Sequence, residues 1–377
     1  MLSTAIVGMA ALVFLAVPPQ EVPDAAGPGE ERPLGAIDLA AIRELYHLTD
    51  TLGADLWPDF DTRTIPIAIN NHDREELLVG HPKPPPEFRL REELELDGAS
   101  VWVREGCTLY GPRGGGWAVT LGGEETAYVG IREEGQPTER YLSLLLHECF
   151  HVYQKRFHKR VEGAMAEGPE DAALNAAWLA LESRILDAAL RATGDDDEVR
   201  ALAEQFVAVR HARRARLSDE VVRLEGEQEF NEGTATYVQA RLYQLLAEHG
   251  GIAPVGEAVD PHYHGFADAA KLYDEMIAGV LPPPRTPVGF FHAMYHHGMA
   301  QGLLLDRVRP EWKEEMTEAG AAPFHLLERE MPLTQDEESA LVERAVAFSV
   351  TPHALDFPAP RVIVGSGRAR TASGGHA

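Results

Sequence analysis

Two histidines and a glutamate in one short stretch have the types and spacing of a metal-dependent hydrolytic centre. His147, Glu148 and His151 form the pattern H-E-x-x-H. Residues four apart lie on one face of a helix, so both imidazoles could bind the same zinc ion. Glu148 would lie beside them, placed to take a proton from a zinc-bound water. The flanking residues of 141–157 are apolar on most faces, which predicts a helix buried in the core.

A catalytic zinc ion normally takes three protein ligands and leaves one position for water. The metzincin pattern would supply the third ligand through G-x-x-H directly after the second histidine. Here Gln154 stands in place of the glycine and Phe157 in place of the histidine. His158 is one residue late, which is roughly a hundred degrees around a helix. The third ligand is therefore expected from another segment.

Residues 231–237 read NEGTATY and offer that ligand. The segment resembles N-E-G-x-A-x-Y of the aminopeptidase-like gluzincins and the N-E start of the thermolysin-like ones. The resemblance implies that Glu232 is the third zinc ligand. Gly233, Ala235 and Thr236 are small, so we expect this helix to approach the H-E-x-x-H helix closely enough for a short carboxylate to reach the metal.

Three acidic residues before this segment are rival ligands, namely Glu225, Glu227 and Glu229. A run of acids is usually a solvated helix face, and we interpret these three in that way. Thr236 stands where thermolysin-like enzymes place an aspartate that orients a ligand, and threonine would be a weaker orienter.

A further pattern, Tyr295-His-His-Gly298, resembles the Y-x-x-G of the aminopeptidase-like gluzincins. In that family the tyrosine hydroxyl stabilises the oxyanion formed when water attacks a carbonyl, so the resemblance assigns this role to Tyr295. His292, His296 and His297 are alternative donors, and the sequence leaves that choice open.

The sequence differs from these gluzincin families in two respects. The spacer between His151 and Glu232 is far longer than in either family, and the aminopeptidase G-x-M-E-N segment is absent, so amino-terminal specificity does not carry over. Helical spacing within the spacer predicts an inserted helical hairpin over 170–217. Its second helix has a basic end, made of Arg210, Arg213, Arg214 and Arg216. We interpret this as a solvated helix end, where positive charge is favourable.

The amino-terminal third predicts a small sheet. After a helix over 35–56, strand-like stretches fall at 64–69, 99–103, 117–121 and 126–131. The last one runs almost directly into the H-E-x-x-H helix. In gluzincins that strand is the sheet edge, where an extended substrate pairs through its backbone. We therefore expect an α+β fold, with a small N-terminal mixed β-sheet followed by a predominantly helical zincin-like catalytic region.

Four parts of the chain follow from these patterns. Residues 1–25 are predicted to be a signal peptide, because their apolar run is too short to span a membrane comfortably. The other parts are an N-terminal sheet subdomain at 34–136, a helical zinc catalytic region at 137–347, and a strand with a disordered tail at 348–377. This organisation predicts an extracytoplasmic protein, secreted or periplasmic; the alternative is anchoring by an uncleaved N-terminal segment.

The composition of the chain limits the kinds of molecule that it could bind. The chain has 377 residues, 45% of them hydrophobic, and a net charge of −26. That charge argues against nucleic acid and anionic membrane surfaces. Two cysteines provide no disulfide framework. We expect a peptide or protein substrate and no stable membrane span once the signal is removed.

Together these patterns predict a zinc metallopeptidase of the gluzincin type, with His147, His151 and Glu232 as ligands and Glu148 as the general base. Tyr295 is the expected oxyanion donor. The alternative is a non-catalytic secreted binding protein on a gluzincin scaffold. The patterns do not indicate the substrate, endo- or exo-specificity, or oligomeric state.

Overall fold

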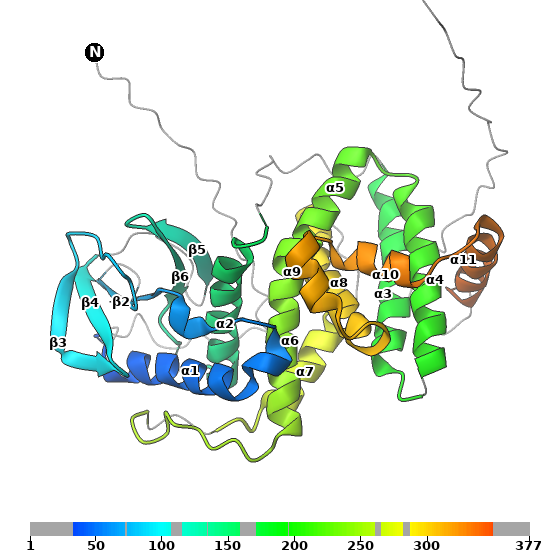
Figure 1. Cartoon of the computed structure of the whole chain (residues 1–377). Helices are drawn as coiled ribbons and strands as arrows, with labels where there is room; N and C mark the ends of the chain where they lie inside the picture. Colours follow the sequence, from blue (N-terminus) through cyan, green and yellow to red (C-terminus); the bar gives the residue numbers. More distant parts are fainter. Residues whose placement is uncertain are drawn as a thin grey trace, which may run out of the picture.

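The computed structural model describes residues 33–71, 74–106, 115–133, 135–158, 171–194, 196–260, 265–281 and 287–349. Within them a six-stranded sheet is followed by ten helices, so the chain is a mixed α/β protein and the predicted order is confirmed. Figure 1 shows the sheet on one side and most helices on the other, with α2 and α6 between them. The predicted signal peptide and the strand at 361–364 lie outside the described residues.

The sheet has the order β3-β4-β2-β1-β6-β5. β1 and β6 are parallel and the other neighbours are antiparallel, so the sheet is mixed as expected. The strands are β1 (Ile67–Asn70), β2 (Glu75–Val79), β3 (Arg89–Leu96), β4 (Ala99–Glu105), β5 (Gly116–Leu121) and β6 (Glu124–Gly130).

One expectation about the sheet is wrong. The strand that leads to the H-E-x-x-H helix, β6, lies inside the sheet, and the edge on this side is β5. A tight turn at Gly122 and Gly123, both with positive φ (57° and 92°), folds β5 back onto β6. β5 is the first strand of this hairpin and lies on the outer side of β6. Helix α2 packs against both strands.

The sheet is covered by helices on one face. Ile67 and Ile69 of β1 join the main hydrophobic core there, whereas Ala68 belongs to a smaller apolar cluster on the other face. This alternation is what a strand with two distinct faces requires. Helices α1 (Ala36–Leu56) and α2 (Thr138–Gln154) contribute to the same core.

The helices after the sheet follow the expected pattern, with the predicted pair at 170–217 formed by α3 and α4, which pack side by side (Figure 1). They are α3 (Ala172–Arg191), α4 (Asp196–Arg214), α5 (Asp219–Gln228), α6 (Thr234–Glu248), α7 (Ala269–Ala278), α8 (Pro287–Val308), α9 (Trp312–Ala319), α10 (Pro323–Glu330) and α11 (Gln335–Ser349). A turn of π-helix, η2 (Glu229–Gly233), joins α5 to α6.

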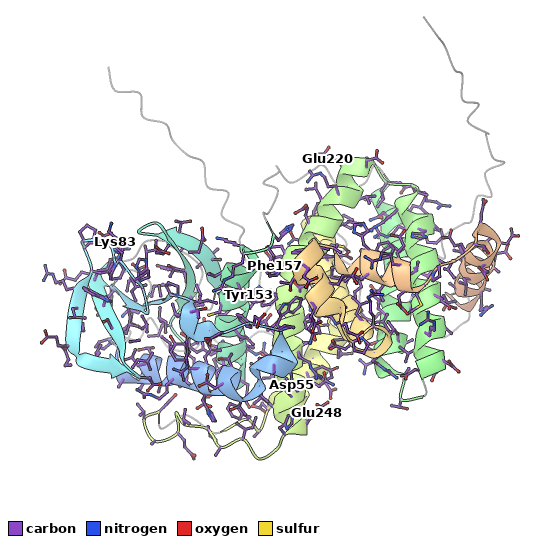
Figure 2. All side chains as sticks on the ribbon, in the orientation of Figure 1. Asp55, Lys83, Tyr153, Phe157, Glu220 and Glu248 are labelled. Atoms are coloured by element: carbon purple, nitrogen blue, oxygen red, sulfur yellow. The ribbon has the colours of Figure 1, made fainter. Side chains whose placement is uncertain are left out.

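Aromatic side chains at the end of α2 connect the two sides of the molecule. The Tyr153 ring lies 5.5 Å from that of Phe157, which in turn lies 6.2 Å from Phe230 of η2. Figure 2 shows Tyr153 and Phe157 along this end of α2. α2 is therefore packed against both the sheet and the helices. Among the described residues, every helix is too short or too polar to cross a bilayer.

Candidate metal centre

His147 and His151 lie on one face of α2, one turn apart, as the pattern predicts. Their ring centroids are 4.6 Å apart and the rings are nearly perpendicular. His147 is buried and His151 is partly open to solvent. The helix itself is apolar on its other faces, where Leu142, Leu145 and Phe150 are fully buried, so its position in the core is fixed.

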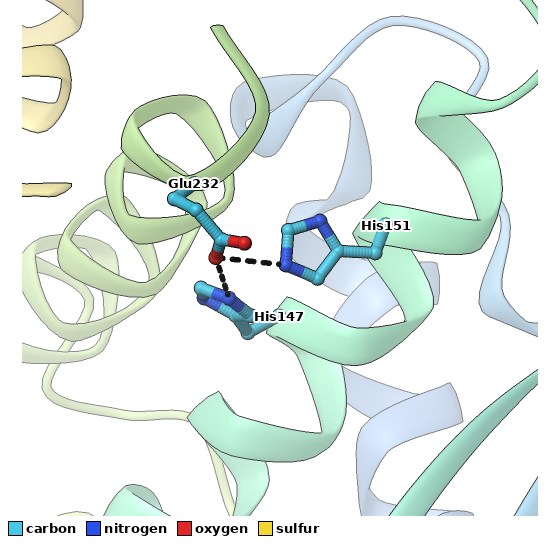
Figure 3. A group of neighbouring side chains, drawn as sticks. All are labelled: His147, His151 and Glu232. Carbon is cyan, nitrogen blue, oxygen red and sulfur yellow. Dashed lines mark hydrogen bonds and ion pairs between the residues drawn. The ribbon is translucent and has the colours of Figure 1, made fainter. Parts of the chain in front are cut away.

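Glu232 of η2 brings a carboxylate to these rings, as Figure 3 shows. Its Oε2 lies 3.2 Å from His151 Nε2 and 3.5 Å from His147 Nε2. The three potential ligand atoms all lie within 4.8 Å of one another. The predicted set of ligands is thus assembled from α2 and η2. The π turn itself was not predicted; such turns occur often at functional sites.

The hydrogen bonds behind the two rings fix which nitrogen carries the proton. Nδ1 of His147 lies 2.9 Å from Gln239 Oε1, and Nδ1 of His151 lies 2.9 Å from Gln154 Oε1. An amide oxygen only accepts, so each neutral ring holds its hydrogen on Nδ1. Each Nε2 then presents a lone pair towards Glu232.

This arrangement suits a bound cation. Two nitrogen lone pairs and a carboxylate oxygen point at one another with no hydrogen between them when the histidines are neutral. His147 Nε2 is buried and makes no hydrogen bond to any residue in the described ranges. Two imidazole nitrogens and one carboxylate oxygen are the donor set of a catalytic zinc site, so the residues present fit zinc.

Glu232 is held so that one oxygen faces the histidines. Asn231 Nδ2 donates to Oε1 over 3.0 Å, which leaves Oε2 directed at the two rings. Burial would raise the pKa of Glu232, but the positive charge of the histidines in their protonated form outweighs burial and holds that pKa well below its ordinary value. Thr236 does not orient a ligand side chain, because its hydroxyl donates to the backbone carbonyl of Glu232.

Glu148 is buried, and its side chain lies against Gly116 of the edge strand β5. A Cβ placed on Gly116 would lie 2.5 Å from Glu148 Cγ and 2.7 Å from Oε1, so any side chain at that position of β5 would have to displace the Glu148 carboxyl group. Burial raises the pKa of Glu148 to about 8, and the charge of His147 offsets only part of this effect. Its Oε2 has no hydrogen-bond partner among the described residues.

Helix α8 crosses η2 at two glycines, one from each sequence pattern. A Cβ on Gly233 would lie 2.6 Å from the Cα of Gly298. The small residue after Glu232 therefore serves the approach of α8, and not that of α2 as expected. This crossing places the preceding turn of α8, which carries Tyr295, near the residue that follows Glu232.

The alternative donors on α8 point in different directions. The ring of Tyr295 lies 4.9 Å from that of His292, which is exposed at the surface. Partial desolvation lowers the pKa of His292, and the charge of Glu232 partly offsets this. His296 faces Gly279 at the end of α7. His297 contacts Ser183 at 2.9 Å and is fully buried among other residues. Among these residues, His292 is the one on which the charge of Glu232 acts, and Tyr295 contacts His292.

The rival carboxylates are not on a solvated face, and that interpretation is wrong for Glu225 and Glu229, which are fully buried. Glu229 pairs with Arg210 and Glu225 with Arg213, both buried arginines from α4. The basic end of α4 is therefore not a solvated helix end either. With Arg214 and Glu182 these residues form a buried network of three arginines and three glutamates, called the ion-pair network below.

The remaining members of the acidic and basic runs, Glu227 and Arg216, lie outside the ion-pair network. Glu227 is half-buried and its Oε2 lies 3.2 Å from His158 Nε2. Arg216 is exposed and lies over the ring of Trp178. The carboxylate that joins the two histidines in the cluster is that of Glu232.

Three functional residues were missed from the sequence. Gln154 and Gln239 orient the histidines, and Gly116 makes room for Glu148. Gln154 follows His151 by one turn of the same helix, so its spacing was a usable signal. Gly116 is the first residue of β5, and the sequence offered no comparable signal for it.

No family model matches the sequence, and no significant match was found among the curated proteins or the solved structures.

Proposed function

We propose that the chain is a zinc-dependent metallopeptidase of the gluzincin type with a zincin-like catalytic region. The observation that supports it most is the convergence of His147 Nε2, His151 Nε2 and Glu232 Oε2 within 4.8 Å of one another. The Nδ1 contacts to glutamine oxygens leave both ring lone pairs free for a metal.

These three atoms would hold the zinc ion. Bound zinc would supply Lewis acidity, which polarises a carbonyl and makes a water molecule more acidic. The remaining chemistry belongs to side chains of this protein, and three of them are placed to take part.

Glu148 is the general base. It adjoins His147 in the sequence, is buried, and has one carboxylate oxygen with no hydrogen-bond partner among the described residues. It accepts a proton from the attacking water and donates that proton to the leaving amine when the C–N bond breaks. Burial raises the pKa of the metal-free carboxyl to about 8, and a nearby dication would lower it towards the range of a base.

Tyr295 and His292 are the donors available to the developing oxyanion. The two rings are in contact on the first turns of α8, and His292 is close enough to Glu232 to feel its charge. Hydrogen-bond donors at such a position stabilise the tetrahedral intermediate. The tyrosine hydroxyl remains our first assignment, with His292 the surviving alternative.

The edge strand β5 supports a peptide as the substrate. Its inner side pairs with β6, and its first residue, Gly116, touches Glu148. An extended peptide added to the outer side of β5 would pass beside the general base. Backbone pairing of this kind binds peptides with little dependence on their side chains.

Digestion of a peptide library tests this function, with Glu148→Gln as the matched variant. We expect new cleavage products with the parent protein and a loss of about 100-fold or more in turnover with Glu148→Gln, which keeps its zinc because Glu148 is not a ligand. Cleavage by Glu148→Gln at the parental rate would contradict the assigned base. Bound zinc without cleavage of any peptide would favour the secreted binding protein.

A further inference from the structure

Gln154 is the last residue of α2, and its one amide group contacts both metal-bearing segments. Its Oε1 lies 2.9 Å from Nδ1 of the ligand His151. Its Nε2 donates to the backbone carbonyls of Phe230 and Asn231, over 3.1 and 3.0 Å. The side chain is 1% exposed, so water does not compete for these hydrogen bonds.

The carbonyls that Gln154 binds belong to η2, the π turn that carries Glu232. The amide nitrogen also lies 2.6 Å from Thr234 Oγ1, and that hydroxyl donates to the carbonyl of Phe230. A π turn departs from the regular backbone hydrogen bonding of an α-helix, so it needs side chains that satisfy its carbonyl groups. Gln154 and Thr234 provide those hydrogen bonds.

These contacts also determine the orientation of the amide. The nitrogen faces two carbonyl oxygens, which only accept, and so the oxygen must face His151. His151 therefore carries a hydrogen on Nδ1, and its Nε2, which faces Glu232 Oε2 at 3.2 Å, is the nitrogen placed to act as a ligand. A single side chain sets the tautomer of one ligand and holds the backbone turn of another.

We propose that Gln154 is a positioning residue that assembles the metal centre, joining the ligand His151 to the turn that carries Glu232. This inference rests on the proposed zinc site. Gln239 is the natural comparison, because it orients His147 but its amide nitrogen faces Ser143 of α2 instead of η2.

The first experiment needs no metal. Nitrogen NMR of histidine-labelled, zinc-free protein reports the tautomer of each ring. We expect a hydrogen on Nδ1 of His151, either in the neutral Nδ1–H form or in an imidazolium paired with Glu232, in the parent and in Gln154→Glu, which retains an acceptor. Gln154→Met should lose this preference for a hydrogen on Nδ1. A neutral His151 with its only ring hydrogen on Nε2 in the parent protein would overturn the inference, whether or not the protein binds zinc. A protein that binds no zinc but has the expected hydrogen on Nδ1 would refute the metal site alone.

The second experiment measures zinc affinity by competition with a chelator. Orienting partners of ligands typically contribute 10–100-fold in metal affinity. We expect Gln154→Met to weaken zinc binding by about 100-fold and Gln239→Met by about 10-fold. Gln154→Glu should also weaken binding despite its normal His151 tautomer, because a carboxylate cannot donate to the carbonyls of η2.

A double-mutant comparison separates positioning from general loss of structure. In a Glu232→Ala background, only the weak residual binding by the two histidines is left, and it is titrated at raised zinc concentration. There Gln154→Glu should have little further effect on zinc affinity, since there is no ligand left for the turn to position. Circular dichroism and thermal unfolding of each variant show that it is folded. Equal loss with and without Glu232, or parental affinity in both Gln154 variants, would overturn the proposal.

Discussion

Gly116 has no side chain, yet it determines the space available to Glu148, the proposed catalytic residue. The carboxyl group of Glu148 occupies the space that a Cβ at position 116 would need. The proposed general base is thus set in place by the backbone of the edge strand as well as by its own helix. Any added atom at Gly116 must displace the Glu148 side chain, because the strand is held by β6.

Gly116→Ala should therefore impair catalysis without removing the metal. A displacement of a catalytic group by about 1 Å can cost about 100-fold in rate, and we expect a fall in kcat of that order with parental zinc content. Steady-state kinetics on any peptide that the parent cleaves measure it. Gly226→Ala is the control, since a Cβ there meets nothing and alanine favours the helix. Equal kinetics for the two variants would refute the role of Gly116.

Among the structural elements, η2 is held by side chains from several helices. Gln154 holds it from the side of α2, and the ion-pair network holds it from the side of α4 through Arg210 and Glu229. Gln301 of α8 donates to the same Glu229 carboxylate over 2.9 Å. The turn that carries the third ligand is therefore fixed by three neighbouring helices.

Loss of Glu229 should cost far more stability than a surface residue would. Removing one partner of a buried ion pair leaves an uncompensated charge, and we expect Glu229→Ala to lower the free energy of unfolding by about 3 kcal/mol. Zinc stoichiometry should be retained, because Glu229 is not a ligand. Denaturant titration checks the value, with Glu227→Ala, a half-buried residue, as the control. A loss of only tenths of a kcal/mol would restore the solvated interpretation.

The ion-pair network should also make the protein sensitive to acid. Burial would raise the pKa values of Glu182 and Glu225, but the surrounding arginines outweigh burial and lower both. A carboxyl group with a lowered folded-state pKa stabilises the protein above its unfolded pKa, about 4.3 for glutamate, and this stabilisation is lost as pH falls towards the folded value.

Thermal unfolding of zinc-free protein between neutral pH and about pH 3 tests this, since removing zinc separates the effect from metal release. We expect Tm to fall steeply below about pH 4 in the parent. Glu225→Gln should begin with a lower Tm at neutral pH and lose less on acidification. Parallel curves for the two proteins would show that the network does not govern acid stability.

For the molecule as a whole, the sequence was informative where the determining contacts are local. Helix spacing placed His147 and His151 correctly, and alternation located β4, β5 and β6. β2 and β3 were missed because their charged residues hide the alternation. Glu76 of β2 is buried, yet it is paired with Arg104 on the neighbouring strand, which the sequence of β2 alone does not show.

The remaining errors involve contacts between distant segments. Nothing in the run around Glu225 and Glu229 shows that α4 would bring arginines against it, so burial could not be inferred. The π turn depends on Gln154 from another helix, and Gly233 meets α8 rather than α2. The ligand set could still be predicted, because each member had a local pattern of its own, whereas the residues that position the ligands did not.

The central claim is that His147, His151 and Glu232 together hold one zinc ion. Metal analysis by mass spectrometry of the parent, His147→Ala/His151→Ala, Glu232→Ala and Glu225→Ala tests it most directly. We predict close to one zinc per chain in the parent and in folded Glu225→Ala, and loss of zinc in the other two variants. Zinc retained at the parental level without the two histidines, or lost with Glu225 but kept without Glu232, would contradict the assignment.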